Sequence, residues 1–149
     1  MFESESLSFD EAYSKRNPQS IVSLTCDIGG SDTLDGDADE DVIIGGASND
    51  TIQAGTENDV VAGDCVLIEY NDTDFMLQRM ESINTDIGGD DVIWLGEGDD
   101  YAIGGASDDE IHGENGLDVI VSIVCGVLIG CRKLGLSLFV LMIYVDDLC

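Results

Sequence analysis

A nine-residue period constrains the fold of this chain more than any other feature of its sequence. Four consecutive units begin at Asp27, Gly36, Gly45 and Ala54, and four more begin at Asp86, Leu95, Gly104 and Gly113. The sixth residue of every unit is Asp: Asp32, Asp41, Asp50, Asp59, Asp91, Asp100, Asp109 and Asp118. The eighth is always aliphatic: Leu34, Ile43, Ile52, Val61, Ile93, Ala102, Ile111 and Ile120. Such strict internal periodicity predicts a repeat protein.

The composition of one unit predicts its conformation. The first positions are rich in glycine, which adopts positive φ angles without steric cost and so allows a sharp turn. The last three residues of a unit have an aliphatic residue at their centre, which is typical of a short strand with one side chain facing inward. Two units then complete one coil, and successive coils stack as parallel strands about 4.8 Å apart. We therefore predict an all-β fold, a parallel β-roll or β-solenoid built from two blocks of repeats.

The charge balance adds a physical requirement to this fold. The formal net charge is −27, which excludes nucleic acid as a partner because the phosphates would be repelled. Stacking places the sixth-position carboxylates in files, where two of them about 5 Å apart repel by roughly 3 kcal/mol. All five basic residues lie outside the repeats: Lys15, Arg16, Arg79, Arg132 and Lys133. A divalent cation is the natural counter-ion, and calcium suits a mixture of carboxylate and carbonyl oxygens. Binding and folding should then be coupled.

The two blocks, Asp27 to Asp64 and Asp86 to Val121, resemble the calcium-binding nonapeptide repeats of RTX proteins. The resemblance implies a non-enzymatic, calcium-binding β-roll module of an extracellular or cell-surface protein, with Ca²⁺ as its cofactor. It also implies that the ligands are the eight Asp carboxylates together with main-chain oxygens of the loops, including Gly45, Gly46, Ser48, Gly104, Gly105 and Ser107. Glycine at the fourth position is replaced at Asp39, Ser48, Glu57 and Ser107. Since side chains disfavour positive φ, we expect weak or empty sites at some of these loops.

The resemblance leaves the role of the whole protein open between three alternatives. The first is a calcium-dependent folding module. The second is an acidic scaffold or adhesin that binds calcium-bearing polysaccharide or mineral. The third is the export or stability segment of a larger secreted protease or lipase. The segment 1–20 contains no apolar stretch typical of a cleavable secretory signal, so we expect either export by an uncleaved route or a chain that is part of a longer one.

A longer period divides the chain into five segments. Residues 21–27 align with residues 80–86 at an offset of 59, which also relates Asp50 to Asp109. We therefore predict an N-terminal segment with a partial connector at 1–26, repeat blocks at 27–64 and 86–121, and a connector at 65–85. The connector reads as a β-hairpin around a turn at 71–74, with a short helix over 75–82 as the alternative. Asp64 lies where it could lend an oxygen to a neighbouring coil.

The fifth segment, 122–149, departs from the acidic pattern. Its apolar runs, 119–131 and 134–145, are each shorter than the about 20 residues that a membrane span requires. A hairpin-like cap that follows the 59-residue period, a membrane-associating tail and an altered reading frame remain equally open for this segment.

Other motifs carry less information. Asp35, Asp37 and Asp39 have the spacing of an EF-hand loop, but the sequence lacks glycine and glutamate at the required later positions. His112 is expected on the surface rather than in a metal site or a catalytic triad, and Trp94 is expected to pack beside a strand. Cys26 and Cys65 flank the first block and could form a disulfide if the roll brings them together.

Overall fold

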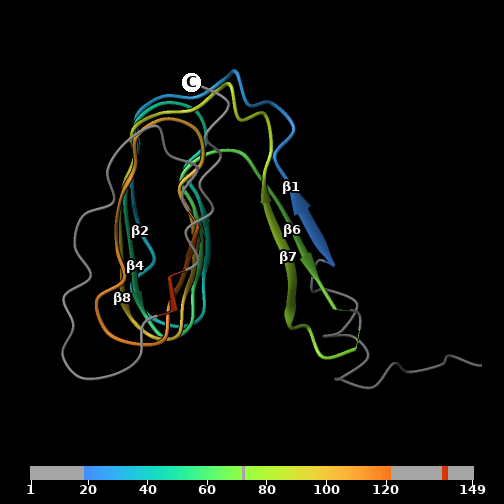
Figure 1. The fold of residues 1–149 in the computed structure, drawn as a ribbon, viewed down its shortest axis with the longest axis vertical. Coiled ribbons are helices and arrows are strands. Elements are labelled where there is room, and N and C mark those ends of the chain that lie inside the picture. The colour runs from blue at the N-terminus through green and yellow to red at the C-terminus, as the bar shows by residue number, and fades with distance from the viewer. Residues whose placement is uncertain (1–18, 72, 122–138, 141–149) are drawn as a thin grey trace, which may run out of the picture.

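The computed structural model describes residues 19–71, 73–121 and 139–140. Within these residues the fold is all-β and contains no helix, as predicted. The strands are β1 (Ser20–Val22), β2 (Thr33–Asp35), β3 (Val42–Ile44), β4 (Thr51–Thr56), β5 (Val60–Ala62), β6 (Val66–Tyr70), β7 (Leu77–Ser82), β8 (Val92–Glu97), β9 (Tyr101–Ile103), β10 (Glu110–His112), β11 (Val119–Val121) and β12 (Phe139–Val140). Figure 1 shows a flattened coil with a separate three-stranded sheet beside it.

Two parallel sheets form the coil, and each takes one strand from every coil. One sheet has the order β10-β8-β4-β2, and the other has the order β12-β11-β9-β5-β3. The eighth residues of successive units lie opposite one another, so that Ile52 pairs with both Leu34 and Ile93. The nine-residue period therefore sets the register of the sheets as well as the position of the strands.

The inward-facing aliphatic side chains form the core between the two sheets. Six of the eight predicted core residues are buried there, and Leu34 and Ile43 of the first coil are partly buried against them. Two further residues, Ala54 and Leu95, join the core. Each is the first residue of its unit and lies within one of the long strands, β4 and β8, which extend past the eighth position. The core is only one or two side chains wide per coil, which leaves little hydrophobic area to stabilise the fold.

The two blocks of repeats stack directly on one another. Strand β4 of the first block pairs with β8 of the second, and β5 pairs with β9. The described coils therefore belong to one continuous roll, although the connector separates them in sequence. The residue ranges assigned to the five segments remain predictions.

The connector is inserted inside a nonapeptide unit rather than between two units. The Gly46 N–H donates to the Gly63 carbonyl (2.7 Å), and the Asp64 N–H donates to the Gly104 carbonyl (3.1 Å). Gly63 and Asp64 thus occupy the first two positions of the unit that continues at Gly88. The sequence assigned those positions to Asp86 and Ile87, which are exposed instead. The unit boundary at Asp86 is therefore corrected by the backbone hydrogen bonds.

The connector itself is the predicted β-hairpin, and the helix alternative is wrong. Strands β6 and β7 pair antiparallel, with an irregularity between Glu69 and Tyr70. Strand β1 pairs antiparallel with the other side of β6, which gives the sheet order β1-β6-β7. Val66 and Ile68 of β6 pack against Val60, Ala62 and Ile103 of the roll in a second hydrophobic cluster. This cluster attaches the hairpin sheet to the outer face of the roll (Figure 1).

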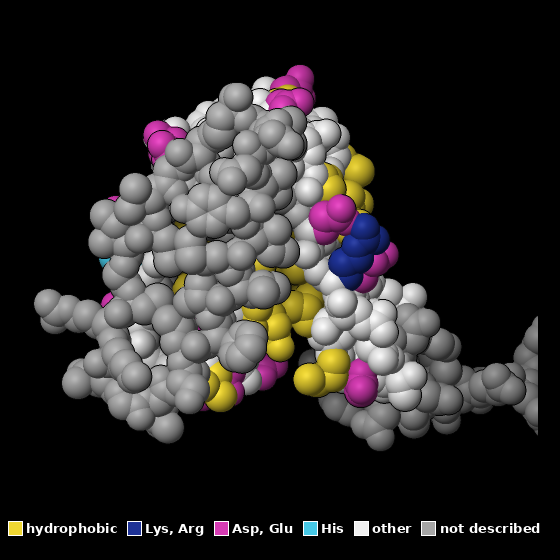
Figure 2. Space-filling view, in the orientation of Figure 1, with side chains coloured by type: hydrophobic (Ala, Val, Ile, Leu, Met, Phe, Trp, Pro, Cys, Tyr) yellow, Lys and Arg dark blue, Asp and Glu magenta, His cyan; other side chains and the backbone are white. Residues whose placement is uncertain are grey.

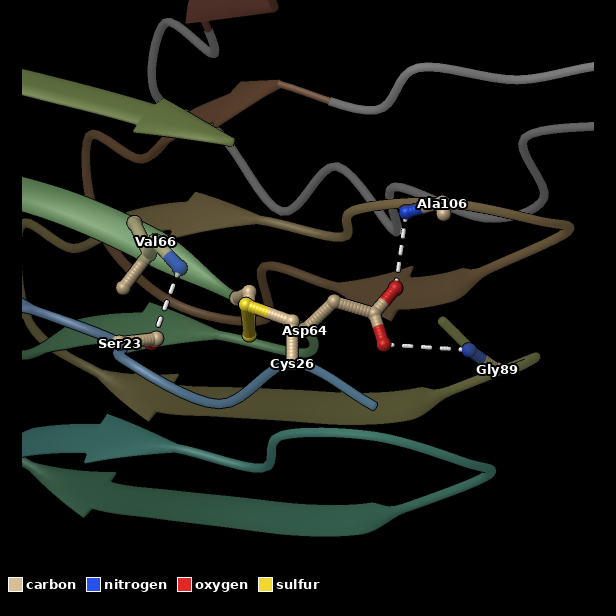
Figure 3. The surroundings of a disulfide bond; sticks show 7 residues. Ser23, Cys26, Asp64, Val66, Gly89 and Ala106 are labelled. Atoms are coloured by element: carbon tan, nitrogen blue, oxygen red, sulfur yellow. Dashed lines mark hydrogen bonds between the residues drawn. A yellow bond between two sulfur atoms is a disulfide. The ribbon is translucent and has the colours of Figure 1, made fainter. Parts of the chain in front are cut away.

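A disulfide fastens the base of the hairpin to the start of the roll (Figure 3). Cys26 and Cys65 are bonded, with their Cα atoms 5.8 Å apart, which confirms the pairing that the sequence allowed. Next to it, Asp64 is 2% exposed and accepts hydrogen bonds from the N–H groups of Gly89 (3.1 Å) and Ala106 (2.8 Å). The chain is therefore held on both sides of the point where it leaves the roll.

The predictions for the segment 122–149 lie outside the described residues, apart from the backbone of Phe139–Val140. That short strand pairs parallel with β11. In the described ranges there is no helix with the length and apolarity to cross a membrane.

Candidate metal centre

The eight sixth-position Asp residues form two continuous hydrogen-bonded chains along the roll. We define the first edge as Asp32, Asp50, Asp91 and Asp109, and the second edge as Asp41, Asp59, Asp100 and Asp118. Along the first edge, the N–H groups of Asp32, Asp50 and Asp91 donate to Oδ1 of the next Asp at 2.8, 2.8 and 3.1 Å. The second edge repeats this arrangement at 2.8, 2.8 and 3.2 Å. The Oδ1 atoms of all these residues except Asp32 and Asp41 are thus fixed by the backbone of the adjacent coil.

The other carboxylate oxygens are buried without a partner. Six of the eight residues are at most 3% exposed: Asp50, Asp59, Asp91, Asp100, Asp109 and Asp118. The Oδ2 atom is buried and accepts no hydrogen bond in six of the eight: Asp41, Asp50, Asp59, Asp91, Asp100 and Asp109. Burying a charged oxygen without a partner is very costly. A regular series of such atoms therefore points to a ligand that supplies positive charge.

Glycine at the first position of a unit leaves space beside each of these oxygens on the first edge. A Cβ atom built on Gly63 would lie 2.1 Å from Asp91 Oδ2 and 2.4 Å from the Gly104 carbonyl oxygen. A Cβ atom on Gly45 would lie 2.4 Å from both Asp50 Oδ2 and the Gly63 carbonyl oxygen. A carboxylate oxygen and a carbonyl oxygen of the neighbouring coil therefore converge at the same place. Any side chain larger than glycine would fill this space.

The two edges differ at this first position. On the first edge, the units of Asp50, Asp91 and Asp109 have Gly45, Gly63 and Gly104 at their first position. Three successive coils therefore have a glycine there. On the second edge, the middle coils have Ala54 and Leu95, whose side chains are buried in the core. The first edge consequently has the more regular set of glycine-lined spaces.

Burial dominates the electrostatics of both edges. It raises the pKa of Asp109 to about 8, that of Asp91 to about 7 and that of Asp100 to about 6. The hydrogen bonds from the adjacent coil lower each pKa by a smaller amount, and neighbouring carboxylates raise it again. Burial raises the pKa of Asp50, Asp59 and Asp118 in the same way. Without a cation, burial therefore shifts these carboxyl groups toward the protonated state.

The predicted loop residues adopt positive φ angles, the conformation that side chains at the fourth position disfavour. Ser48 and Ser107 have φ angles of 80° and 76°, and Asp39 and Glu57 have φ angles of 82° and 78°. The fourth position is thus left-handed even where glycine is missing. Gly45 and Gly104 lie in the same turns beside Asp50 and Asp109 of the first edge, whereas Gly105 lies beside Asp64 and a Cβ atom on Gly46 would meet nothing within 4 Å. Their role as ligands remains a prediction.

Sequence reasoning missed two features of these edges. The first is the carbonyl oxygen of Gly63, which lies beside Asp50 in the same way as Gly104 lies beside Asp91. The second is the full role of Asp64: the sequence suggested that it lends an oxygen to a coil, and in the structure both of its oxygens accept backbone hydrogen bonds and so connect coils. Burial raises the pKa of Asp64 to about 6. The sequence contained a signal for this placement of Gly63 and Asp64, because Gly63 follows Ala54 by nine residues and so continues the period.

No protein cation neutralises these carboxylates within the described part of the chain. Arg79 lies on the hairpin, where it pairs with Glu69 (3.4 Å) and with Glu81. His112 stacks on Trp94 with ring centroids 5.5 Å apart and contacts Glu110 (2.8 Å), so it is a half-buried residue of the outer sheet face. In residues 19–71 and 73–121, no three His, Cys, Asp or Glu side chains gather as a metal cluster. A bound ion would therefore need backbone carbonyls as well as carboxylates.

The donor set fits calcium. Carboxylate and carbonyl oxygens are the ligands that this ion takes, in a flexible arrangement, and both kinds converge beside Gly45 and Gly63 with the carboxylate oxygen unpaired. The fold and the edges together define a repetitive parallel β-roll with acidic turns.

Residues 28–63 and 87–120 match the family model of the RTX calcium-binding nonapeptide repeat (4 copies), and these segments of the chain belong to that family. No curated protein and no solved structure shows significant similarity to the chain.

The glycine-lined space makes a direct prediction for Gly63→Ala. The new methyl group would contact Asp91 Oδ2 and the Gly104 carbonyl, and one of them must move. We expect the free energy of unfolding in saturating calcium to fall by about 1–3 kcal/mol, the usual cost of overpacking. Urea denaturation measures this change. Gly30→Ala is the matched control, since a Cβ atom there meets nothing within 4 Å. Equal stability of the two variants would contradict the described packing.

Proposed function

We propose that the chain is a calcium-binding β-roll module that folds when calcium binds between its coils. The unpaired, buried Oδ2 atoms of six sixth-position Asp residues carry this proposal. Burial raises the pKa of five of these six residues, so a cation next to Oδ2 would offset the cost of the buried charge. Membership of the two blocks in a calcium-binding repeat family supports calcium as that cation.

The proposed ligands are the eight sixth-position carboxylates and the carbonyl oxygens of the turns. We place the strongest sites on the first edge, where Asp50, Asp91 and Asp109 each lie beside a first-position glycine. The contribution of the protein is to hold Oδ1 by a backbone N–H and to direct Oδ2 toward the neighbouring coil. Calcium would supply the positive charge that allows adjacent carboxylates to stay close together.

We further propose that the module functions outside the cytoplasm, in a secreted or cell-surface protein. The disulfide between Cys26 and Cys65 supports this location, because such bonds persist in oxidising compartments. Calcium concentrations there are high enough for sites with dissociation constants of about 10⁻⁴–10⁻³ M. The module itself requires no catalytic group for this role.

A calcium titration of the full chain tests the proposal. In chelator at pH 7.5 we expect little regular structure, because the ionised carboxylates repel and the core is thin. Added calcium should produce a cooperative gain of the far-UV circular dichroism signal of β structure, at roughly millimolar concentration. Magnesium at the same concentration is the control, since it requires a stricter octahedral geometry. Spectra that do not change between chelator and calcium would refute the coupling of folding to binding.

A further inference from the structure

The pairing of β1 with β6 shows how a hairpin sheet receives a strand from the preceding repeat. Residues of β1 lie 59 positions before residues of β7, so β1 is the equivalent of β7 from the preceding period. Ile21 of β1 is opposite Ile68 of β6. The Ser23 N–H donates to the Val66 carbonyl (3.1 Å), and the Val66 N–H donates to Ser23 Oγ (3.2 Å). The last strand of one connector thus binds the first strand of the following one.

The outer edge of β7 repeats the features that β1 uses. Ser82 corresponds to Ser23, Gln78 corresponds to Gln19, and both pairs are identical. In the described residues β7 pairs only with β6, and the Ile83 N–H next to it donates to the Cys65 carbonyl (3.0 Å). Because alternate residues of an antiparallel strand bond to opposite sides, the backbone groups of Met80 and Ser82 face away from β6.

A hydrophobic groove lies next to this edge, between β7 and the roll. Its volume is about 210 Å³, and its lining includes Leu77, Met80, Tyr101, Ile103, Val119 and Val121. Figure 2 shows hydrophobic side chains gathered where the roll and the hairpin sheet diverge. The groove and the edge of β7 therefore form one continuous surface.

One period earlier, the equivalent of this groove is filled. Val119 and Val121 correspond to Val60 and Ala62 at the offset of 59. Val60 and Ala62 are only 8% and 0% exposed, because they pack in one cluster with Val66 and Ile68 of β6. Val119 and Val121 are half-buried. Val121 is only partly buried against this cluster, and Val119 is not part of it in the described residues.

We propose that the outer edge of β7 and the adjoining groove are a docking surface for the β6-type strand of a further hairpin repeat. The register of β1 and β6 places the equivalent of Ile68 opposite Met80, and the equivalent of Glu69 opposite Arg79. The strand therefore presents apolar residues to the groove and a carboxylate to an arginine. A second intact copy of the chain does not fit, since its own β6 is already flanked by β1 and β7.

A tandem insertion tests this assignment. In the full chain, residues 63–121 are repeated once after Val121, and amide exchange is measured by NMR in saturating calcium. We expect exchange at Met80 and Ser82 to slow by at least about tenfold, because their N–H groups become part of a sheet. The matched control carries Val66→Lys and Ile68→Lys in the inserted copy alone, and it should lose this protection. Protection of Ile52 in the roll shows that each variant is folded.

A second measurement covers the case in which the inserted copy does not fold. A synthetic peptide with the sequence of residues 64–71 is added in excess to the 149-residue chain, and it should slow exchange at Met80 and Ser82. The assignment is wrong if Ile52 stays protected while neither the insertion nor the peptide protects Met80 and Ser82. It is also wrong if these two amides are already protected in the 149-residue chain, since the segment 122–149 would then occupy the surface.

Discussion

The Asp109→Asn variant should need at least about ten times more calcium to fold than the parent chain, the minimum effect expected when a group that supports a metal site is changed. Asp109 is 3% exposed, its Oδ2 atom has no partner, and it lies beside Gly104 on the first edge. Asparagine keeps the oxygen that accepts the Asp91 N–H, so the coil geometry is preserved. Only the negative charge and one acceptor oxygen are lost.

The same substitution should have the opposite effect without calcium. The chelated variant should be more ordered than the chelated parent, because a buried charge next to other carboxylates has been removed. Circular dichroism as a function of calcium measures both effects. Asp108→Asn is the matched control, since it removes one charge at the neighbouring, exposed position. If both variants shift the calcium midpoint equally, general charge rather than a site at Asp109 is responsible.

Acid should increase the order of the calcium-free chain. Burial raises the pKa of Asp91 to about 7 and that of Asp109 to about 8, above the value of 3.8 for an exposed Asp. The folded state then binds more protons than the unfolded state between these values. Its stability is fully present below the unfolded pKa and is lost as the pH rises through about 6–8. In chelator, we expect β structure to increase when the pH falls from 8 to 5.

The calcium-loaded chain should respond to acid in the opposite direction. A bound cation favours the ionised carboxylates and so depresses their pKa below the unfolded value. Relative to the unfolded chain, this stability is present above the unfolded pKa and is lost as the pH falls below it. At pH 5.5–7.5, calcium instead competes with the protons that Asp91 and Asp109 hold in the ordered calcium-free state, so the calcium midpoint should rise as the pH falls, by up to about tenfold per pH unit for each proton displaced. Titrations at pH 5.5, 6.5 and 7.5 measure this slope, and a midpoint independent of pH would show that the carboxylates are not the ligands.

The sequence predicted the repetitive part of the fold in detail because one period controls both strand position and burial. An aliphatic residue at every eighth position must face inward if the coil closes, and Ile52, Ile93 and Ile111 lie in one register in the core. The Asp residues at every sixth position must line the edges for the same reason. Hairpin strands were also predictable, because their alternation differs from the nonapeptide pattern.

The connection between the blocks could not be predicted from the sequence. Asp86 and Ile87 fit the frame of a repeat unit, but Gly63 and Asp64 also fit it, because Gly63 follows Ala54 by nine residues, so the order of residues does not decide between the two pairs. The choice depends on hydrogen bonds between coils, such as that from the Asp64 N–H to Gly104, which are long-range contacts. The carbonyl of Gly63 and the hydrogen bonds of Asp64 followed from that placement and were missed for the same reason.

The disulfide at the base of the hairpin has a mechanical consequence. Cys26 precedes β2 and Cys65 follows β5, so the bond encloses every strand of the first two coils. A pulling force on the two ends of the chain would pass from Cys26 to Cys65 through the sulfur atoms. Residues 27–64 would carry no tension, and resistance to stretching would rest on the sheet of β1, β6 and β7 and on the coils formed by β8 to β11.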